Sequence, residues 1–403
     1  MLKRLSLYFS FSIVNAGITF LTSVFLARNL PVDDFGVIGL FLAVLYFAKP
    51  LASFNAVGLV AINKANFNKE RFKSFSDVYF TFQMIFSVFL LLISLILSQV
   101  FYEYMFVFLI LPFLIFVMVF TEFHYAELVQ QKNSLYYGGY VFVTRVLVLL
   151  FSFLLINFYD FNWKAYLWAL FLSEIIVLVI KVKISFVTLR GFSFSVEKSE
   201  ILKIITFGLP LFIFLIAGWG LNQADKFIVL HFFSIKEVAF YTVAYSLGVS
   251  INTVNQALTN SILPVIYDAL KEGGAEGVIK KYTLYYTTFI TLCIVILGCS
   301  ASYFVPLFYG EEYSSSISIV VLISIAFGFN GLYRITGMVI EYHKLNVLKT
   351  KLVFSSMLIN IILSIMLIDG YGVLAPAIGT IVAYMYLAFT SQYYGNKILK
   401  DAY

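Results

Sequence analysis

Charge is the scarcest property of this 403-residue sequence, because only 12% of its residues are Asp, Glu, Lys or Arg. Soluble domains carry about 25% charged residues, so this chain cannot cover a water-facing surface with polar groups. Hydrophobic residues make up 62% of the sequence. Apolar runs of roughly 20 residues, each long enough to cross a bilayer, recur along the whole length. The composition therefore predicts a polytopic membrane protein.

The residue patterns of common catalytic and metal sites are also missing. Cys293 and Cys299 fall within one apolar run, which does not suit a structural disulfide, and the three histidines are scattered. No Gly-Lys dipeptide occurs, which excludes a P-loop, and no Gly-x-Ser-x-Gly nucleophile motif is present. We therefore expect no metal, no cofactor and no enzymatic activity, and transport fits the sequence better than catalysis.

The apolar runs predict an all-α fold of about twelve transmembrane helices. Backbone groups in lipid must be hydrogen-bonded internally, and these runs are apolar all round rather than alternating, so we expect helices and not barrel strands. The predicted spans are 6–28, 35–62, 78–100, 104–121, 138–158, 164–182, 204–230, 237–264, 281–304, 315–340, 350–368 and 373–394.

The distribution of Lys and Arg predicts the orientation. With the N-terminus placed in the cytoplasm, the cytoplasmic segments hold 20 of the 27 Lys and Arg residues, whereas the opposite loops hold only Arg28, Lys164 and Lys236. Cytoplasmic loops carry such an excess, so both termini are expected in the cytoplasm. Because the basic residues follow this topology, the net charge of +6 does not indicate nucleic-acid binding.

The longest polar connection, 183–203, divides the spans into six and six. We expect an N-terminal lobe over 1–190, a cytoplasmic linker that includes 191–203, and a C-terminal lobe over 204–403. A faint repeat supports this division, because NLPVDDFGVIGLFLAV (29–44) aligns with FFSIKEVAFYTVAYSL (232–247) at an offset of 203 residues. Two similar halves are a common transporter plan, with the substrate site at their interface.

Six ionisable residues lie inside the predicted spans, where each costs about 2.5–3.5 kcal/mol near a helix centre. They should therefore face the bundle interior or a hydrated cavity, although a structural ion pair or snorkelling remains an alternative for each. Cations exceed anions four to two, and Arg and Lys are the usual partners of phosphate, so the interior suits an anionic substrate. The six residues are Lys49, Arg145, Glu174, Asp225, Lys226 and Arg334.

The eighth predicted span carries a polar face, because its polar residues recur at intervals of three and four. In lipid such a face must meet another helix or a polar cavity, so it predicts either interhelical hydrogen bonds or a wall that contacts sugar hydroxyls. The residues of this face are Tyr245, Asn252, Asn255, Gln256, Thr259 and Asn260.

Several stretches resemble the polysaccharide transporters of the multidrug/oligosaccharidyl-lipid/polysaccharide exporter superfamily. LARNLPVDDFGVIGL (26–40) resembles the end of that family's first helix and the start of its second. FGLPLFIFLIAGWGLNQADKFIVLHFFSIKEVAFYTVAYSL (207–247) is similar to its seventh-to-eighth helix signature, with Pro210, Asp225-Lys226, Tyr241 and Ala244 at the matching positions. SILPVIYDAL (261–270), VPLFYGEEYSSS (305–316) and YGVLAPAIGTIVAY (371–384) look like the later signatures. Twelve spans fit the O-antigen (Wzx-type) flippases of this superfamily.

The resemblance implies a MATE-like fold with a pseudo-two-fold repeat, and a flippase that moves undecaprenyl-diphosphate-linked oligosaccharide across the bacterial inner membrane. On this reading Lys49, Arg145, Arg334 and Lys226 are candidates for binding the diphosphate, and Asn252, Asn255, Gln256 and Asn260 for the glycan. Asp225 and Glu174 are ion-pair or coupling candidates. The expected partners are the lipid-linked glycan and membrane lipid, with a glycan polymerase and a chain-length regulator as further candidates.

Three alternatives remain open from the sequence. A cation or drug antiporter of the related multidrug branch would favour acidic rather than basic interior residues. A flippase for the lipid-linked peptidoglycan precursor belongs to the same class with a different substrate. A non-transporting scaffold for the glycan polymerisation machinery would tolerate neutralisation of the interior charges.

Overall fold

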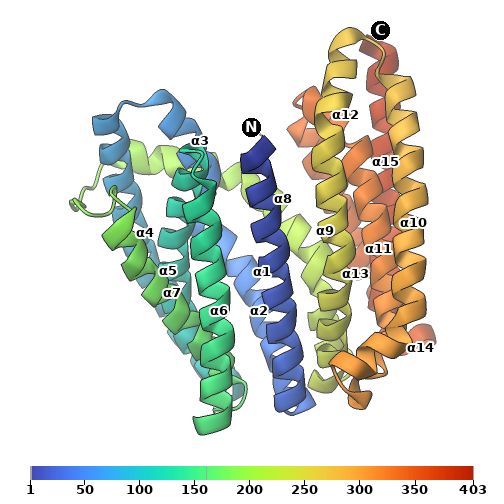
Figure 1. The fold of residues 1–403 in the computed structure, drawn as a ribbon, viewed down its shortest axis with the longest axis horizontal. Helices are drawn as coiled ribbons and strands as arrows, with labels where there is room; N and C mark the ends of the chain where they lie inside the picture. The colour runs from blue at the N-terminus through green and yellow to red at the C-terminus, as the bar shows by residue number, and fades with distance from the viewer. Residues whose placement is uncertain (1, 160, 403) are drawn as a thin grey trace. The chain divides into compact units, whose positions relative to one another are not determined.

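The computed structural model describes residues 2–159 and 161–402, without the side chains of residues 2–9, 103, 210, 211 and 402. Within these residues the regular structure is entirely helical (Figure 1). The all-α prediction is therefore confirmed, and each of the twelve predicted spans lies largely within a helix. The first and last residues, which the charge distribution places in the cytoplasm, are outside the described residues.

The first half of the chain contains seven of the described α-helices and one 3-10 turn. In order, these are α1 (Leu2–Asn29), α2 (Val32–Ser53), α3 (Ala56–Asn66), α4 (Lys69–Val100), η1 (Tyr102–Tyr104), α5 (Met105–Gln130), α6 (Ser134–Tyr159) and α7 (Lys164–Ile184). The second half contains α8 (Lys198–Phe232), α9 (Ile235–Glu272), α10 (Ala275–Phe308), η2 (Glu311–Tyr313), α11 (Ser316–Thr336), α12 (Met338–Tyr342), α13 (Asn346–Met366), α14 (Ile368–Tyr371), η3 (Gly372–Leu374) and α15 (Ala375–Ala402).

Ten helical segments in the described part of the chain are long and apolar enough to cross a membrane, with α2–α3, α11–α12 and α14–α15 each counted as one. Helices α7 and α9, with 21 and 38 residues, contain the other two predicted spans but are not among these ten. The count of twelve spans therefore remains a prediction. The protein is thus a multi-pass membrane protein.

The chain forms two compact units. Unit 1 comprises Met1–Leu30 and Phe41–Leu215, and unit 2 comprises Pro31–Leu40 and Ile216–Tyr403. Helices α2 and α8 therefore each belong in part to both units. The sequence-based division into two lobes at 191–203 is a separate matter from this grouping by contact, and it remains a prediction.

The non-helical connection between α7 and α8, residues 185–197, packs on unit 1. Ser193 Oγ donates to Asp77 Oδ2 over 3.0 Å, and the Ser195 backbone N–H donates to Thr81 Oγ1 over 3.0 Å. Asp77 also forms an ion pair with Lys73 one turn earlier on α4. This connection is therefore anchored to α4 at Ser193 and Ser195.

The predicted span 35–62 is not one continuous helix, because it breaks between α2 and α3. Phe54 and Asn55 have φ angles of 45° and 56°, in the left-handed region that non-glycine residues rarely adopt. Pro50, in the last turn of α2, lacks the N–H that a continuous helix requires. The Tyr79 hydroxyl donates to the free Ser53 carbonyl over 2.9 Å, which satisfies the interrupted backbone.

The sequence repeat has a structural counterpart at the start of α2 and α9. α1 ends at Asn29 and α8 ends at Phe232, while α2 begins at Val32 and α9 at Ile235, so both boundaries recur 203 residues apart. Within unit 2, Gly39 approaches the side chain of Thr242, which is its own counterpart at this offset. Such contact between equivalent positions is what a local two-fold relation produces.

Candidate functional site

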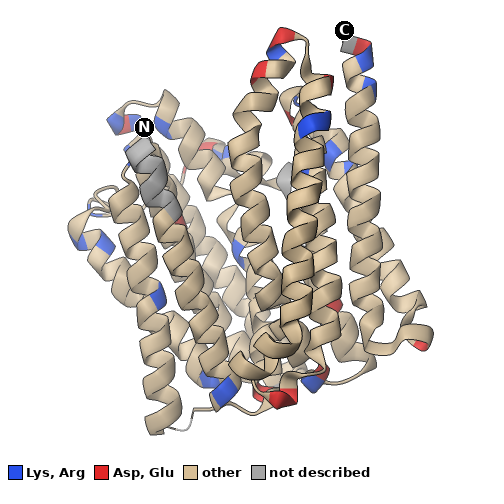
Figure 2. Ribbon diagram, turned by 45° about the vertical axis from the view of Figure 1, so that its right-hand side comes forward, with Lys and Arg blue, Asp and Glu red and all other residues tan. Residues whose placement is uncertain are grey.

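Most charged residues lie at helix ends, and few lie along the middle of the helices (Figure 2). The ten predicted site residues, six of them charged and four of them amides, divide between the two units. Lys49, Arg145 and Glu174 belong to unit 1, and the other seven belong to unit 2. Each group is therefore described within its own unit.

Lys49 lies on α2, one turn before the break at Phe54 and Asn55. Its Nζ lies 3.5 Å from Glu122 Oε2 on α5, and about a third of its side chain is exposed. Broken helices line the substrate sites of many transporters, because the freed backbone groups need a polar surrounding. Lys49 is thus placed next to the local structure expected of a binding site.

Lys181 was not among the residues singled out from the sequence, which placed it with the cytoplasmic charges. Helix α7 continues to Ile184, and the Lys181 side chain is fully buried. Its Nζ lies 3.7 Å from the Tyr125 ring centroid and 5.8 Å from that of Tyr140, and it has no hydrogen-bond partner. A buried ammonium held only by aromatic faces retains much of its desolvation cost.

Glu174 lies about two turns before this lysine on α7, and Arg145 lies on α6. Glu174 is buried on α7 and accepts a hydrogen bond from Thr121 Oγ1 over 3.3 Å. Both Glu174 and Lys49 act electrostatically on Lys181, and Arg145 acts on Tyr125, the ring that holds Lys181. We call this set the unit 1 cluster, which comprises Lys49, Glu122, Arg145, Glu174 and Lys181.

A second polar network joins the ends of α3, α5 and α7 to the connection that follows. Glu127 Oε1 accepts from Lys64 Nζ and from Thr188 Oγ1, each over 2.9 Å. Glu127 Oε2 lies 3.6 Å from His124 Nδ1, and His124 Nε2 lies 2.8 Å from Ser185 Oγ. Because its charges are paired, we assign this network to holding unit 1 together.

Asp225 is the centre of the polar interior of unit 2. Its fully buried carboxylate accepts hydrogen bonds from Tyr245 Oη over 2.6 Å, Thr380 Oγ1 over 2.8 Å and Asn360 Nδ2 over 3.2 Å. Among the described ion pairs none joins Asp225 to its neighbour Lys226. Four helices, α8, α9, α13 and α15, therefore meet at one carboxylate whose partners are all neutral.

Lys226 is buried and turns toward the start of α2. Its Nζ donates to the Gly39 carbonyl over 3.4 Å and lies 5.6 Å from the Tyr245 ring centroid. Arg334, on α11, is half-buried and donates from Nε to Asn330 Oδ1 over 2.9 Å. These two cations do not meet a carboxylate among the described ion pairs of unit 2.

The polar face of α9 divides into two parts. Asn255 is fully buried, and its side chain forms hydrogen bonds within unit 2. Its Nδ2 donates to the Phe327 carbonyl over 2.7 Å, and its Oδ1 accepts from Tyr286 Oη over 2.8 Å. Gln256 and Asn260 are exposed, and Asn252 is half-buried. The structure thus gives Asn255 an interhelical role and leaves the other three amides available for contacts.

Some of these groups could have been found in the sequence. Asn360 and Thr380 stand within apolar runs, where isolated polar residues signal an interior position. Glu122 and Lys181 were harder to find, because the predicted spans ended at residues 121 and 182, at or near those positions. Hydropathy locates the apolar part of a helix and misses the turns that continue beyond it.

Solved structures with this fold are transporters and a flippase. An inward-facing multidrug resistance MATE family transporter of the MOP superfamily has a TM-score of 0.77 at 15% identity, over 96% of this chain and 95% of that one. The lipid II flippase MurJ, in an inward closed conformation, has a TM-score of 0.79 at 12% identity, over 98% and 92%. At such identities the likeness concerns the fold alone, and it confirms the predicted MATE-like fold class.

Sequence comparison gives one short match and one long one. "Lsg locus putative protein 1" of Haemophilus influenzae is 29% identical over 85 residues, and the match spans about a fifth of that relative, 21% of either chain. The profile of the polysaccharide biosynthesis protein family matches residues 25–318, which is well over half of the sequence. The chain therefore belongs to the polysaccharide biosynthesis protein family, and its fold is that of the MOP-superfamily transporters and flippases.

Proposed function

We propose that this protein is a flippase that moves an undecaprenyl-diphosphate-linked oligosaccharide from the inner to the outer leaflet of the bacterial inner membrane by alternating access. The family membership supports a role in polysaccharide biosynthesis, and the MurJ-like fold supports translocation of a lipid-linked substrate. The orientation with both termini in the cytoplasm, inferred from the basic residues, belongs to this proposal.

The observation that carries the proposal is the set of interior cations without a carboxylate partner. None of the ion pairs among the described residues includes Arg145, Lys181, Lys226 or Arg334, although all four lie within the long helices. An uncompensated cation inside a membrane protein is costly and marks a functional site by default. A diphosphate would supply the missing negative charge during transport.

We assign separate roles to three cations of this set and to Lys49, which differs from them in being paired with Glu122. Lys49, Arg145 and Arg334 are partly exposed, so they can reach a diphosphate, whereas Lys226 is buried and donates to a backbone carbonyl. Gln256, Asn260 and Asn252 are the amides of α9 that can contact the glycan. Asp225 and Glu174 remain the candidates for coupling, because each is a buried carboxylate without an ion pair.

The test is alanine substitution at Lys49, Arg145 and Arg334, each alone, with surface glycan measured against the amount of protein in the membrane. We expect the glycan to be lost while protein amounts stay normal. Lys183→Ala is the control, because Lys183 is an exposed lysine outside the set of interior cations. Full surface glycan in all three variants would refute the cationic role.

The substrate is identified by analysing the lipid-linked glycan that accumulates in a strain lacking this protein. A lipid-linked oligosaccharide is the expected product. Accumulation of the peptidoglycan precursor would instead assign the chain to that substrate. Sensitivity to cationic drugs without any glycan accumulation would favour an antiporter, to which the fold likeness to multidrug transporters also extends.

A further inference from the structure

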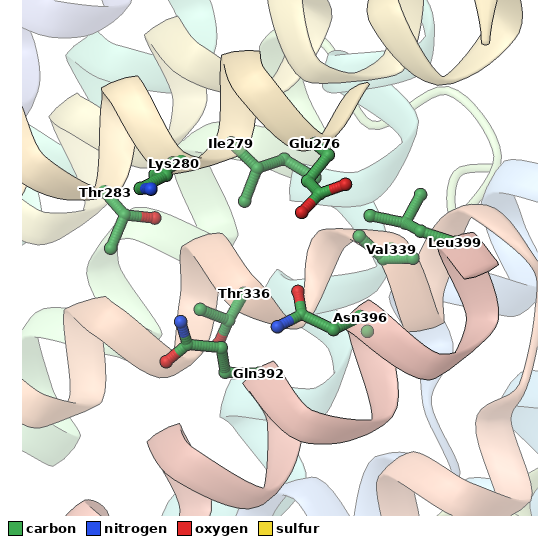
Figure 3. Close-up of a pocket in the computed structure, with 10 residues that line it drawn as sticks. Glu276, Ile279, Lys280, Thr283, Thr336, Val339, Gln392, Asn396 and Leu399 are labelled. Carbon is green, nitrogen blue, oxygen red and sulfur yellow. The ribbon is translucent and has the colours of Figure 1, made fainter. Parts of the chain in front are cut away.

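Unit 2 contains a pocket that lies apart from the interior charges. It has a volume of about 270 Å³ and opens between the first turns of α10 and the last turns of α15. Figure 3 shows polar side chains on both sides of this opening, with Glu276, Lys280 and Thr283 on α10 and Gln392 and Asn396 on α15. Ile279, Val339 and Leu399 contribute apolar surface to the lining. The pocket is thus amphiphilic and carries one charge of each sign.

The polar groups of the pocket have unused hydrogen-bonding capacity. Glu276 and Lys280 stand four residues apart in the order that favours a helical ion pair, yet no such pair is present among the described residues. Thr283 Oγ1 is buried without a partner. A buried hydroxyl without a hydrogen bond costs about 1–3 kcal/mol, which a ligand could recover.

The depth of the pocket matches the headgroup layer of a membrane. α10 has 34 residues and spans about 50 Å at about 1.5 Å per residue, well beyond a hydrocarbon core of about 30 Å. Glu276 and Lys280 lie in its first two turns, outside the apolar stretch, whereas the side chains of Leu284 and Tyr393 beside the pocket are about two-thirds exposed. Lipid chains can cover such apolar side chains while a headgroup occupies the pocket.

We propose that this pocket binds the headgroup of an ethanolamine phospholipid in the cytoplasmic leaflet. The Lys280 ammonium meets the phosphate, the Glu276 carboxylate accepts from the lipid ammonium, and Thr283, Gln392 and Asn396 bond the remaining oxygens. The assignment to the cytoplasmic leaflet rests on the orientation proposed above, in which the Lys-rich ends of these helices face the cytoplasm. This site is separate from the proposed glycan path, since it uses none of the residues assigned there.

The pair of opposite charges sets the expected selectivity among lipids. Phosphatidylglycerol carries the phosphate but no ammonium, so it would leave Glu276 unpaired. Phosphatidylcholine carries a quaternary ammonium that has no N–H to donate and is bulkier. Ethanolamine lipid alone of these three satisfies both charges by hydrogen bonds.

The test uses the full-length protein purified into nanodiscs that contain the three phospholipids in equal amounts. Bound lipid is counted by native mass spectrometry after release. We expect ethanolamine lipid to be retained in preference to the other two. Lys280→Gln and Glu276→Gln should each reduce its retention about fivefold, which corresponds to about 1 kcal/mol, the net contribution of one hydrogen bond.

The matched controls are Lys281→Gln and Glu272→Gln, exposed neighbours that do not line the pocket and should leave retention unchanged. Thr283→Val, which keeps the side-chain shape, supplies a third variant if a charge change impairs folding. Displacement by free phosphoethanolamine is expected, because the headgroup carries the recognition. Equal retention of the three lipids, preference for phosphatidylglycerol, or equal losses in the control variants would each overturn the proposal.

Discussion

Lys181 places a charged group in a buried position, where its desolvation is unfavourable. Its ammonium is fully buried against the Tyr125 ring, and a desolvated cation–π contact is worth about 2 kcal/mol or more. That gain does not replace the hydrogen bonds that the ammonium makes in water. A methionine of similar length would fill the same space without this cost, so the charge itself needs a functional reason.

We therefore predict that Lys181→Met separates stability from transport. Replacing a buried ammonium that has no hydrogen-bond partner by an apolar residue removes its desolvation cost, so the unfolding midpoint of the purified protein should stay the same or rise. Surface glycan should fall, because the unit 1 cluster loses one of its three cations. Thermal unfolding in detergent and glycan analysis measure the two effects.

Lys183→Met provides the comparison, because Lys183 is exposed and should be neutral in both measurements. A large drop in the unfolding midpoint of Lys181→Met together with normal glycan would show that the lysine has only a structural role.

At the scale of helices, α9 combines packing and exposed amides on neighbouring positions. Asn255 bonds the Phe327 carbonyl and the Tyr286 hydroxyl, and so links α9 to α10 and α11. The next residue, Gln256, is exposed. Adjacent residues of similar chemistry therefore perform different tasks.

Asn255→Leu should destabilise the protein by about 1–3 kcal/mol, because it leaves the buried Phe327 carbonyl without its donor. Gln256→Ala should change stability by less than about 0.5 kcal/mol, as is usual for exposed positions. Denaturation of both variants in the same detergent makes the comparison. Equal stability of the two would contradict the division of this helix face.

The helical nature of the twelve apolar runs could be predicted from the sequence. In lipid, the backbone N–H and C=O groups of such non-alternating runs are all hydrogen-bonded only when the runs form helices. The interruptions within helices could not be predicted. The break at Phe54 and Asn55 depends on tertiary contacts such as the hydrogen bond from the Tyr79 hydroxyl to the Ser53 carbonyl. The candidate site was predicted in part for a similar reason. Lys49 and Asp225 stand out within apolar runs, whereas the importance of Lys181 appears only once Tyr125 and Tyr140 are seen around it.

At the scale of the whole molecule, the orientation proposed from the basic residues can be tested by labelling. In a protein whose Cys293 and Cys299 are replaced by Ala, single Lys236→Cys and Glu311→Cys variants should react with an impermeant maleimide added to spheroplasts. Lys271→Cys should react only after lysis, because the turn after α9 is assigned to the cytoplasm. The reverse pattern would invert the proposed topology.

The contact of Gly39 with Thr242 also bears on how the two halves of the sequence could diverge. Equivalent positions that touch across a local two-fold relation share one fixed volume, so a larger residue at one of them requires a smaller one at the other. The glycine at position 39 leaves room for the threonine hydroxyl at position 242. At these two positions the halves of the sequence could thus not diverge independently, because the size of each residue limits the size of its counterpart.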